Sequence, residues 1–196
     1  MFRCCREAMP YTTALTSLIL DVPKFANMKK ILVLPGSLRR ESSSNQIINA
    51  IVSLAPAEVT FEVSHDSATL PHFDDPQETP SSVIAFRNKI ARADAVLICT
   101  PEYAFGIPGS LKNAIDWTVG SGELVGKPVG LITASSQGEK GHAAMLLVLS
   151  AVSANVHADS TLLIPFVRAK LDAGGNVKDE ALTGKLRHVV MTLCNQ

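Results

Sequence analysis

Hydroxyl and basic side chains gather in a short loop between a strand-like and a helix-like segment. Residues 31–45 read ILVLPGSLRRESSSN, an apolar run typical of a buried strand followed by a polar loop. Apolar residues then recur at helical spacing, and Ser43 with Gln46 three residues later predicts a capping box. A strand, a tight loop and a helix N-terminus offer free backbone N–H groups and the positive end of the helix dipole, which suit a phosphate. The loop adds neutral donors and one planar cation, namely Ser37, Ser42, Ser43, Ser44, Asn45 and Arg39. An ordinary capped loop with solvated polar residues remains the alternative.

A second loop combines aromatic residues with glycines. Residues 101–109 read PEYAFGIPG and follow the apolar run AVLICT. Glycines let a backbone approach a ligand closely, and Tyr103 or Phe105 could lie along a planar ring. Burial of Phe105 under neighbouring helices or a partner subunit is equally consistent with the sequence.

Strand-like and helix-like segments alternate from Met28 onward. We expect strands at residues 31–34, 59–64, 95–100, 128–134 and 160–164, and helices at residues 81–92, 108–119, 141–154 and 178–193, besides the helix that follows the first loop. This alternation predicts an α/β fold, a doubly wound five-stranded parallel sheet with helices on both faces. Ligands bind such sheets beyond the carboxyl ends of the strands, where the strand order reverses. For the flavodoxin-like order 2-1-3-4-5, the loops after strands one, three and four should form the site.

Composition excludes several classes of protein. The 196 residues suffice for one domain with a substantial core; 46% are apolar, 18% are charged, and the formal net charge is zero. Nothing in this balance favours nucleic acid or an anionic membrane surface.

The four cysteines have neither metal nor disulfide spacing, so we expect reduced thiols and a cytoplasmic protein. The five histidines lack metal spacing and no metal is expected, although His72 and His142 fall near the expected ligand face.

Residues 1–27 differ from the rest of the chain. The apolar run 14–20 is too short to span a bilayer, and no small-residue cleavage pattern follows it. Met28-Lys29-Lys30 resembles a natural start. We therefore expect residues 1–27 to be an extension outside the fold and residues 28–196 to be the domain, with a docked N-terminal arm as the alternative.

Four common catalytic or nucleotide-binding motifs are absent. The first loop lacks the G-x-G-x-x-G of dinucleotide sites, and the chain has no G-x-x-x-x-G-K-[ST] phosphate loop. No cysteine occurs at residues 35–45, which disfavours a cysteine phosphatase, and no G-x-S-x-G elbow indicates a serine hydrolase.

Two motifs instead resemble one enzyme family. TPEYAFGIPGSLKNAIDWTVGSGEL is similar to the signature of the NAD(P)H-dependent FMN reductases, which include quinone, chromate and azo-dye reductases. GSLRRESSSN resembles the flavin phosphate loop of that family, and the resemblance covers nearly all of residues 30–193. Two departures stand out. Ala104 replaces a common asparagine, which would remove a side-chain contact to the flavin, and the first loop is one residue longer before its asparagine.

The resemblance implies which residues contact the cofactor. It implies that the FMN phosphate is bound by Ser37, Arg39, Ser43, Ser44 and Asn45, with Ser42 as an alternative among the serines. It implies that the backbone of Pro101, Glu102, Tyr103, Ala104, Phe105 and Gly106 lies along the edge of the isoalloxazine ring. Ser135 and Gly138 of the loop 135–141 would close its pyrimidine side. Asp116 and Trp117 would fall in a helix at a dimer interface, with simple core burial of Trp117 as the alternative.

The implied function is that of an FMN-dependent NAD(P)H oxidoreductase. A hydride would pass from nicotinamide to N5 of FMN and on to a small acceptor such as a quinone, free flavin, an azo compound or chromate, with no side-chain nucleophile. The resemblance also implies a homodimer or homotetramer. A flavodoxin-like electron carrier or regulatory module is the alternative, although carriers often have a strongly acidic face that this neutral chain lacks. A family member that no longer binds FMN is a further alternative because of Ala104.

Overall fold

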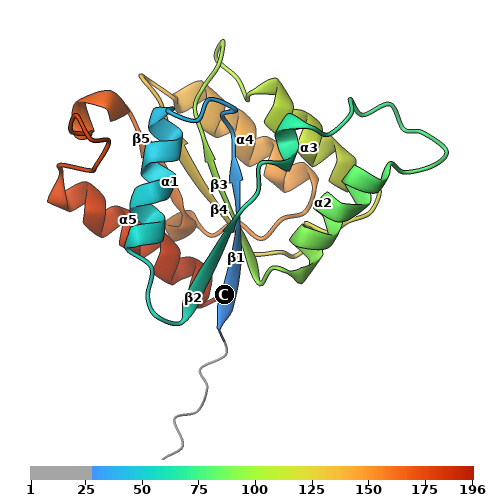
Figure 1. The fold of residues 1–196 in the computed structure, drawn as a ribbon, viewed down its shortest axis with the longest axis horizontal. Coiled ribbons are helices and arrows are strands. Elements are labelled where there is room, and N and C mark those ends of the chain that lie inside the picture. Colours follow the sequence, from blue (N-terminus) through green and yellow to red (C-terminus); the bar gives the residue numbers. More distant parts are fainter. Residues whose placement is uncertain (1–27) are drawn as a thin grey trace, which may run out of the picture.

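A five-stranded parallel sheet forms the centre of the molecule (Figure 1). The computed structural model describes residues 28–196, so the expectations for residues 1–27 lie outside the described residues. The strand order is β2-β1-β3-β4-β5, which confirms the flavodoxin-like order predicted from the sequence. The strands are β1 (Lys29–Pro35), β2 (Val59–Val63), β3 (Ala95–Thr100), β4 (Val129–Ala134) and β5 (Thr161–Ile164).

Helices cover both faces of the sheet (Figure 1). They are α1 (Ser43–Ser53), α2 (Ser81–Arg92), α3 (Gly109–Val119), α4 (Glu139–Ala151) and α5 (Glu180–Cys194), with short 3-10 turns η1 (Asp66–Ala68), η2 (Ala158–Ser160) and η3 (Val167–Lys170). One core lies between the sheet and helices α1 and α5, and the other between the sheet and helices α2, α3 and α4. Among the described helices, none is long and apolar enough to cross a membrane.

The central strands explain why the apolar runs are continuous. Every residue of β3 and β4 is buried, because helices cover both faces of these strands. Successive side chains point to opposite faces, so Leu97 joins the core under α1 and α5 while Val96 and Ile98 join the other. The same alternation places Val33 and Leu32 of β1 in opposite cores.

Helix α1 begins differently from the sequence-based prediction. Ser42, not Ser43, is the N-cap, and its hydroxyl accepts a hydrogen bond from the Asn45 N–H at 3.2 Å. The predicted capping box of Ser43 and Gln46 is therefore wrong. The run of three serines offered three caps of nearly equal intrinsic preference.

Trp117 belongs to the core of this chain. Its side chain is buried, and its Nε1 donates a hydrogen bond to the Pro71 carbonyl at 2.8 Å. Phe73 packs edge-to-face against it with the ring centroids 5.1 Å apart. Asn113 also binds this loop, through the Phe73 N–H and the Pro71 carbonyl. These contacts attach the loop before α2 to helix α3.

Gly36 generates a testable prediction because it packs directly on β3. Its N–H donates to the Cys99 carbonyl at 2.8 Å, and a Cβ at this position would lie 2.1 Å from Thr100 Oγ1 and 2.8 Å from Thr100 Cα. We expect Gly36→Ala to lower the free energy of unfolding by about 1–3 kcal/mol, the range for overpacking. Urea denaturation measures this change. Gly184→Ala is the matched control, since a Cβ there meets nothing within 4 Å and should stabilise α5 slightly. Equal stability of wild type and Gly36→Ala would contradict the packing.

His142 predicts a pH dependence of stability. Its Nδ1 lies 2.9 Å from Thr133 Oγ1, and burial lowers the pKa of His142 below its ordinary value. The unfolded chain therefore binds more protons than the folded chain as the pH falls from the ordinary histidine pKa through the lowered one. We expect wild type to lose more stability than His142→Gln between about pH 7.5 and about pH 5.5, measured by urea denaturation. Parallel losses in the two proteins would refute this assignment.

Candidate functional site

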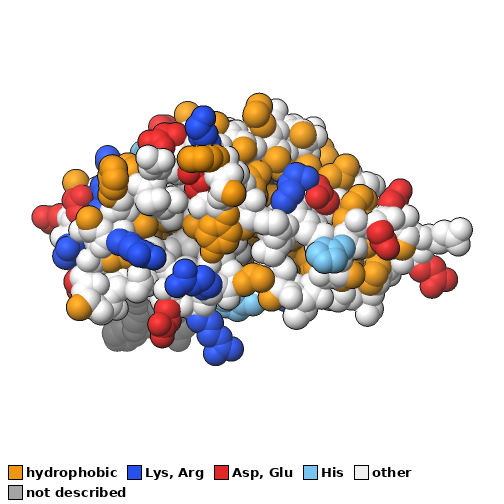
Figure 2. Space-filling view, turned by 90° about the horizontal axis from the view of Figure 1, so that it is seen from above, with side chains coloured by type: hydrophobic (Ala, Val, Ile, Leu, Met, Phe, Trp, Pro, Cys, Tyr) orange, Lys and Arg blue, Asp and Glu red, His pale blue; other side chains and the backbone are white. Residues whose placement is uncertain are grey.

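A cavity of about 750 Å³ opens at the carboxyl edge of the sheet. The last residue of β4 and residues from the segments after β1, β3, β4 and β5 line it, namely Arg39, Glu41, Ser42, Ser43, Ser44, Gln46, Pro101, Glu102, Tyr103, Ala134, Ser135, Ser136, Phe166, Val167, Arg168, Ala169, Leu171 and Asp172. Figure 2 looks down on this edge and shows basic side chains beside exposed apolar ones. The volume falls within the range of small-molecule and cofactor sites.

The first turn of α1 supplies free backbone donors to this cavity. The N–H groups of Ser43 and Ser44 form no hydrogen bond within residues 28–196, as is normal at a helix start. Ser42 Oγ lies 3.1 Å from Ser44 Oγ, so the hydroxyls are themselves hydrogen-bonded. Arg39 lies in the loop before this turn and also lines the cavity. This combination suits an anion with several oxygen atoms.

Asn45 closes the loop rather than lining the cavity. Its Nδ2 donates to the carbonyls of Arg39 and Arg40 at 2.8 and 3.3 Å. Its Oδ1 is buried and has no hydrogen-bond partner in the described part of the chain. An unsatisfied buried acceptor of this kind calls for a donor from outside the chain, such as a ligand hydroxyl or a water molecule.

Ser37 links two loops from a buried position. Its Oγ lies 3.2 Å from the Tyr103 hydroxyl and accepts the Arg39 N–H at 3.3 Å. The side chain of Ser37 therefore holds the loop after β1 against the loop after β3. Tyr103 itself lines the cavity and stays partly exposed.

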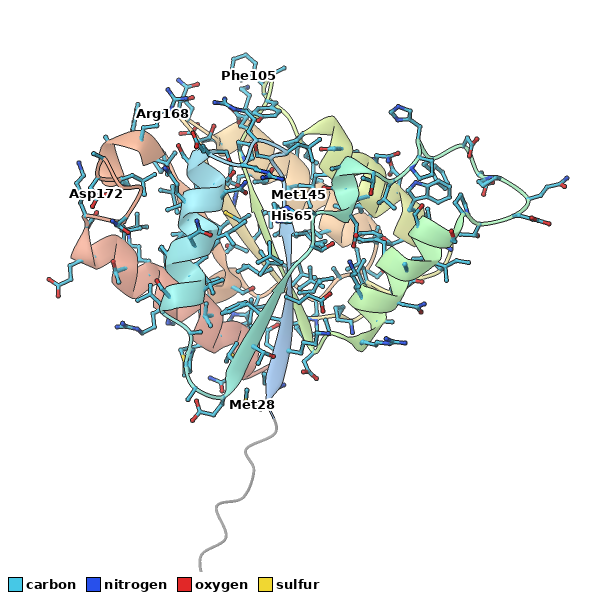
Figure 3. The ribbon with its side chains drawn as sticks, in the orientation of Figure 1. Met28, His65, Phe105, Met145, Arg168 and Asp172 are labelled. Carbon is cyan, nitrogen blue, oxygen red and sulfur yellow. The ribbon has the colours of Figure 1, made fainter. Side chains whose placement is uncertain are left out.

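The loop after β3 ends in a tight hairpin. Tyr103 and Gly106 exchange two backbone hydrogen bonds of 3.1 and 2.9 Å, and the two residues between them have positive φ angles, 49° at Ala104 and 58° at Phe105. Such turns prefer asparagine and glycine, so this conformation is strained. Phe105 is 66% exposed at the tip of the loop (Figure 3). The alternative that neighbouring helices of the same chain bury Phe105 is therefore wrong.

Glu102 connects the loops after β3 and β4. Its carboxylate accepts the N–H of Gly141, in the first turn of α4, at 2.6 Å, where the helix dipole favours negative charge. Its own N–H donates to Ser135 Oγ at 3.3 Å. Gly141 permits this approach, because a Cβ there would lie 3.0 Å from Glu102 Cγ. Gly138 is buried at the N-cap of α4 with a φ of 104°, so it shapes the turn and does not line the cavity.

The structure thus divides the predicted site residues into two groups. Those that line the cavity are Arg39, Ser43, Ser44, Pro101, Glu102, Tyr103 and Ser135. Those that lie outside its lining are Ser37, Asn45, Ala104, Phe105, Gly106 and Gly138.

The segment after β5 contributes to the cavity without having been predicted. It supplies Phe166, Val167, Arg168, Ala169, Leu171 and Asp172. The N–H groups of Phe166 and Val167 donate to the carbonyls of Ser136 and Ser135, both at 3.1 Å. The available signal was its position, because the carboxyl end of the fifth strand lies at the same edge of the sheet.

Cys99 is not a nucleophile of this site. It is fully buried, its thiol donates to the Ser44 carbonyl at 3.3 Å, and burial raises the pKa of the thiol. Within residues 28–196, no three His, Cys, Asp or Glu side chains form a group able to hold a metal ion.

Comparisons with known proteins agree with this geometry. Residues 29–168 match the model of the family described as NADPH-dependent FMN reductase. The chain is 38% identical over 162 residues to a 2-hydroxy-1,4-benzoquinone reductase of Burkholderia sp, covering 77% of this chain and 86% of that protein. It is 39% identical over 120 residues to a quinone reductase of Escherichia coli K12, covering 58% of this chain and 63% of that protein.

A solved structure has the same fold. FerB of Paracoccus denitrificans, described as a flavoenzyme NAD(P)H:(acceptor) oxidoreductase, superposes with a TM-score of 0.76 at 30% identity. The match covers 85% of this chain and 96% of that one. Residues 29–168, which the family model matches, include β1 to β5 and the loops that line the cavity up to Arg168. This chain therefore belongs to the NADPH-dependent FMN reductase family.

Proposed function

We propose that this chain binds FMN in the cavity at the carboxyl edge of the sheet and uses NAD(P)H to reduce small acceptors such as quinones. The observation that carries the proposal is the cavity itself, which joins an anion-binding helix start to a loop that can lie along a planar ring. When bound, FMN supplies the hydride and electron chemistry, and the protein supplies position and electrostatics.

The first turn of α1 is the proposed phosphate site. The Arg39 guanidinium and the free N–H groups of Ser43 and Ser44 would bind the phosphate oxygens. Asn45 would hold the loop in place through its hydrogen bond to the Arg39 carbonyl. This arrangement fits the phosphate of a phosphorylated flavin.

The loop after β3 is the proposed site of the ring edge, because its residues Pro101, Glu102 and Tyr103 line the cavity. The N–H groups of Ala104 and Phe105 form no hydrogen bond within residues 28–196, so they are available as donors. The Gly141 N–H donates a hydrogen bond to the Glu102 carboxylate. The Glu102 N–H in turn donates to Ser135 Oγ, which fixes the backbone of Glu102. Donors next to the ring would stabilise negative charge as it develops there. Ala104 has only a methyl side chain, so its contribution is limited to its backbone.

A quinone is the acceptor class we favour. The two curated relatives described above are named quinone reductases, and the formal net charge of zero differs from the strong acidity typical of electron carriers. The free thiols of Cys99 and Cys194 fit a reducing compartment such as the cytoplasm.

Anaerobic addition of NADPH to the FMN-loaded protein tests the function. We expect the visible flavin absorption to bleach within the mixing time, because NADPH would reduce the bound FMN. The absorption should return when a benzoquinone is added, because the quinone would reoxidise the flavin. Protein without flavin is the control for direct reduction of the quinone. A bound flavin that stays oxidised with NADPH would favour the carrier or regulatory module instead.

We further propose that a second copy of the chain covers the outer face of α4. Residues 143–151 read AAMLLVLSA, and Leu147 is 73% exposed although a helix that is apolar all round is normally buried. Light scattering after gel filtration should give a dimer or tetramer, and Leu147→Glu should shift it toward a monomer. Ile84→Glu, at an exposed apolar position of α2, should leave the mass unchanged. A monomeric wild type would contradict this proposal.

A further inference from the structure

A second guanidinium, that of Arg168, lines the same cavity as that of Arg39. Arg168 belongs to η3, which follows β5, and Figure 3 shows it at the upper edge of the molecule, on the α1 side of Phe105. The sequence predicted only Arg39 as a cation of this site, so the role of Arg168 is a separate question.

Backbone hydrogen bonds hold Arg168 at the cavity. The preceding residues Phe166 and Val167 donate to the carbonyls of Ser136 and Ser135, and Val167 is buried. Phe166 has a φ of 52°, a left-handed conformation that is unfavourable for a non-glycine residue. Strain of this kind persists where the surrounding structure fixes the backbone, and it is concentrated at functional sites.

The same segment lies beside the first turn of α1. A Cβ at Gly175 would lie 2.7 Å from Gln46 Nε2, so the backbone after η3 approaches α1 closely. Gln46, Leu171 and Asp172 all line the cavity. The segment after β5 therefore lines the same cavity as the first turn of α1 and lies next to that turn.

None of the three carboxylates of the cavity lining forms an ion pair with Arg168. Glu102 accepts the Gly141 N–H, and Asp172 accepts the N–H groups of Gly174 and Asn176 at 2.8 and 2.9 Å. Glu41, the remaining acidic residue of the lining, is exposed. Neither Arg39 nor Arg168 forms an ion pair within residues 28–196. An anion in the cavity would therefore meet two guanidinium groups without carboxylate partners.

We propose that Arg168 is a specificity-determining residue that binds a phosphate monoester together with Arg39, and that this group is the 5′-phosphate of FMN. The inference rests on the proposed function. Two planar guanidinium groups that line one cavity suit a phosphate dianion, because each can form paired hydrogen bonds with its oxygens. Arg168 would thereby select FMN over riboflavin. The 2′-phosphate of NADPH has the same chemistry and is the other source to distinguish.

Flavin titrations of the flavin-depleted full chain test this role. Fluorescence quenching gives Kd for FMN and for riboflavin in wild type, Arg168→Gln, Arg168→Lys and Arg39→Gln. We expect Arg168→Gln and Arg39→Gln each to weaken FMN binding by about tenfold or more while leaving riboflavin binding unchanged. Arg168→Lys should lose less FMN affinity than Arg168→Gln, because lysine keeps the positive charge but cannot form the paired hydrogen bonds of a guanidinium group. Arg187→Gln, at an exposed position of α5 outside the cavity lining, is the matched control and should bind both flavins as wild type does.

Each other outcome has a definite meaning. Unchanged FMN affinity in Arg168→Gln, or an equal loss for FMN and riboflavin, overturns the inference. If that variant keeps its FMN affinity but binds NADPH more weakly and NADH as before, the phosphate is the 2′-phosphate of NADPH and the flavin assignment is wrong. Wild type that binds neither flavin overturns the proposed function instead. Thermal unfolding of each variant without flavin confirms that the fold is intact.

Discussion

The close packing of Gly36 on β3 is the constraint on which the site depends. Because Gly36 has no side chain, its backbone lies against Thr100 and donates to the Cys99 carbonyl. This contact extends the β1–β3 pairing, in which Pro35 is opposite Cys99, by one residue. It brings the loop after β1 over the end of β3, where Ser37 reaches Tyr103 and the Cys99 thiol reaches the Ser44 carbonyl. The start of α1, the proposed phosphate site, is thus fixed relative to the hairpin.

From there, a series of hydrogen bonds crosses the edge of the sheet. Glu102 joins the loop after β3 to Ser135 and to the first turn of α4. The carbonyls of residues 135–136 then accept the N–H groups that start η3. Hydrogen bonds within the chain therefore link the segments after four strands. Such preorganisation suits a cofactor enzyme, in which the protein contributes binding and orientation.

The sequence predicted the fold closely because burial on both faces leaves a strong pattern. The limits of β3 and α2 agree with the predicted ranges, since continuous apolar residues mark one and helical spacing marks the other. The roles of Ser37 and Asn45 were not predictable in detail, because the Ser37–Tyr103 contact joins residues 66 positions apart. The position of Arg168 at the cavity was not predicted, because it depends on how the segment after β5 packs against α1. No local sequence pattern encodes that packing.

The amide resonances of Ser43 and Ser44 test the central claim most directly. In a ¹⁵N-labelled, flavin-depleted sample, FMN should shift both resonances strongly downfield, because their free N–H groups would donate to the phosphate. Riboflavin should leave them nearly unchanged while still moving the resonances of Ala104 and Phe105. FMN that binds without shifting the Ser43 and Ser44 amides would show that the phosphate lies elsewhere and would contradict the account.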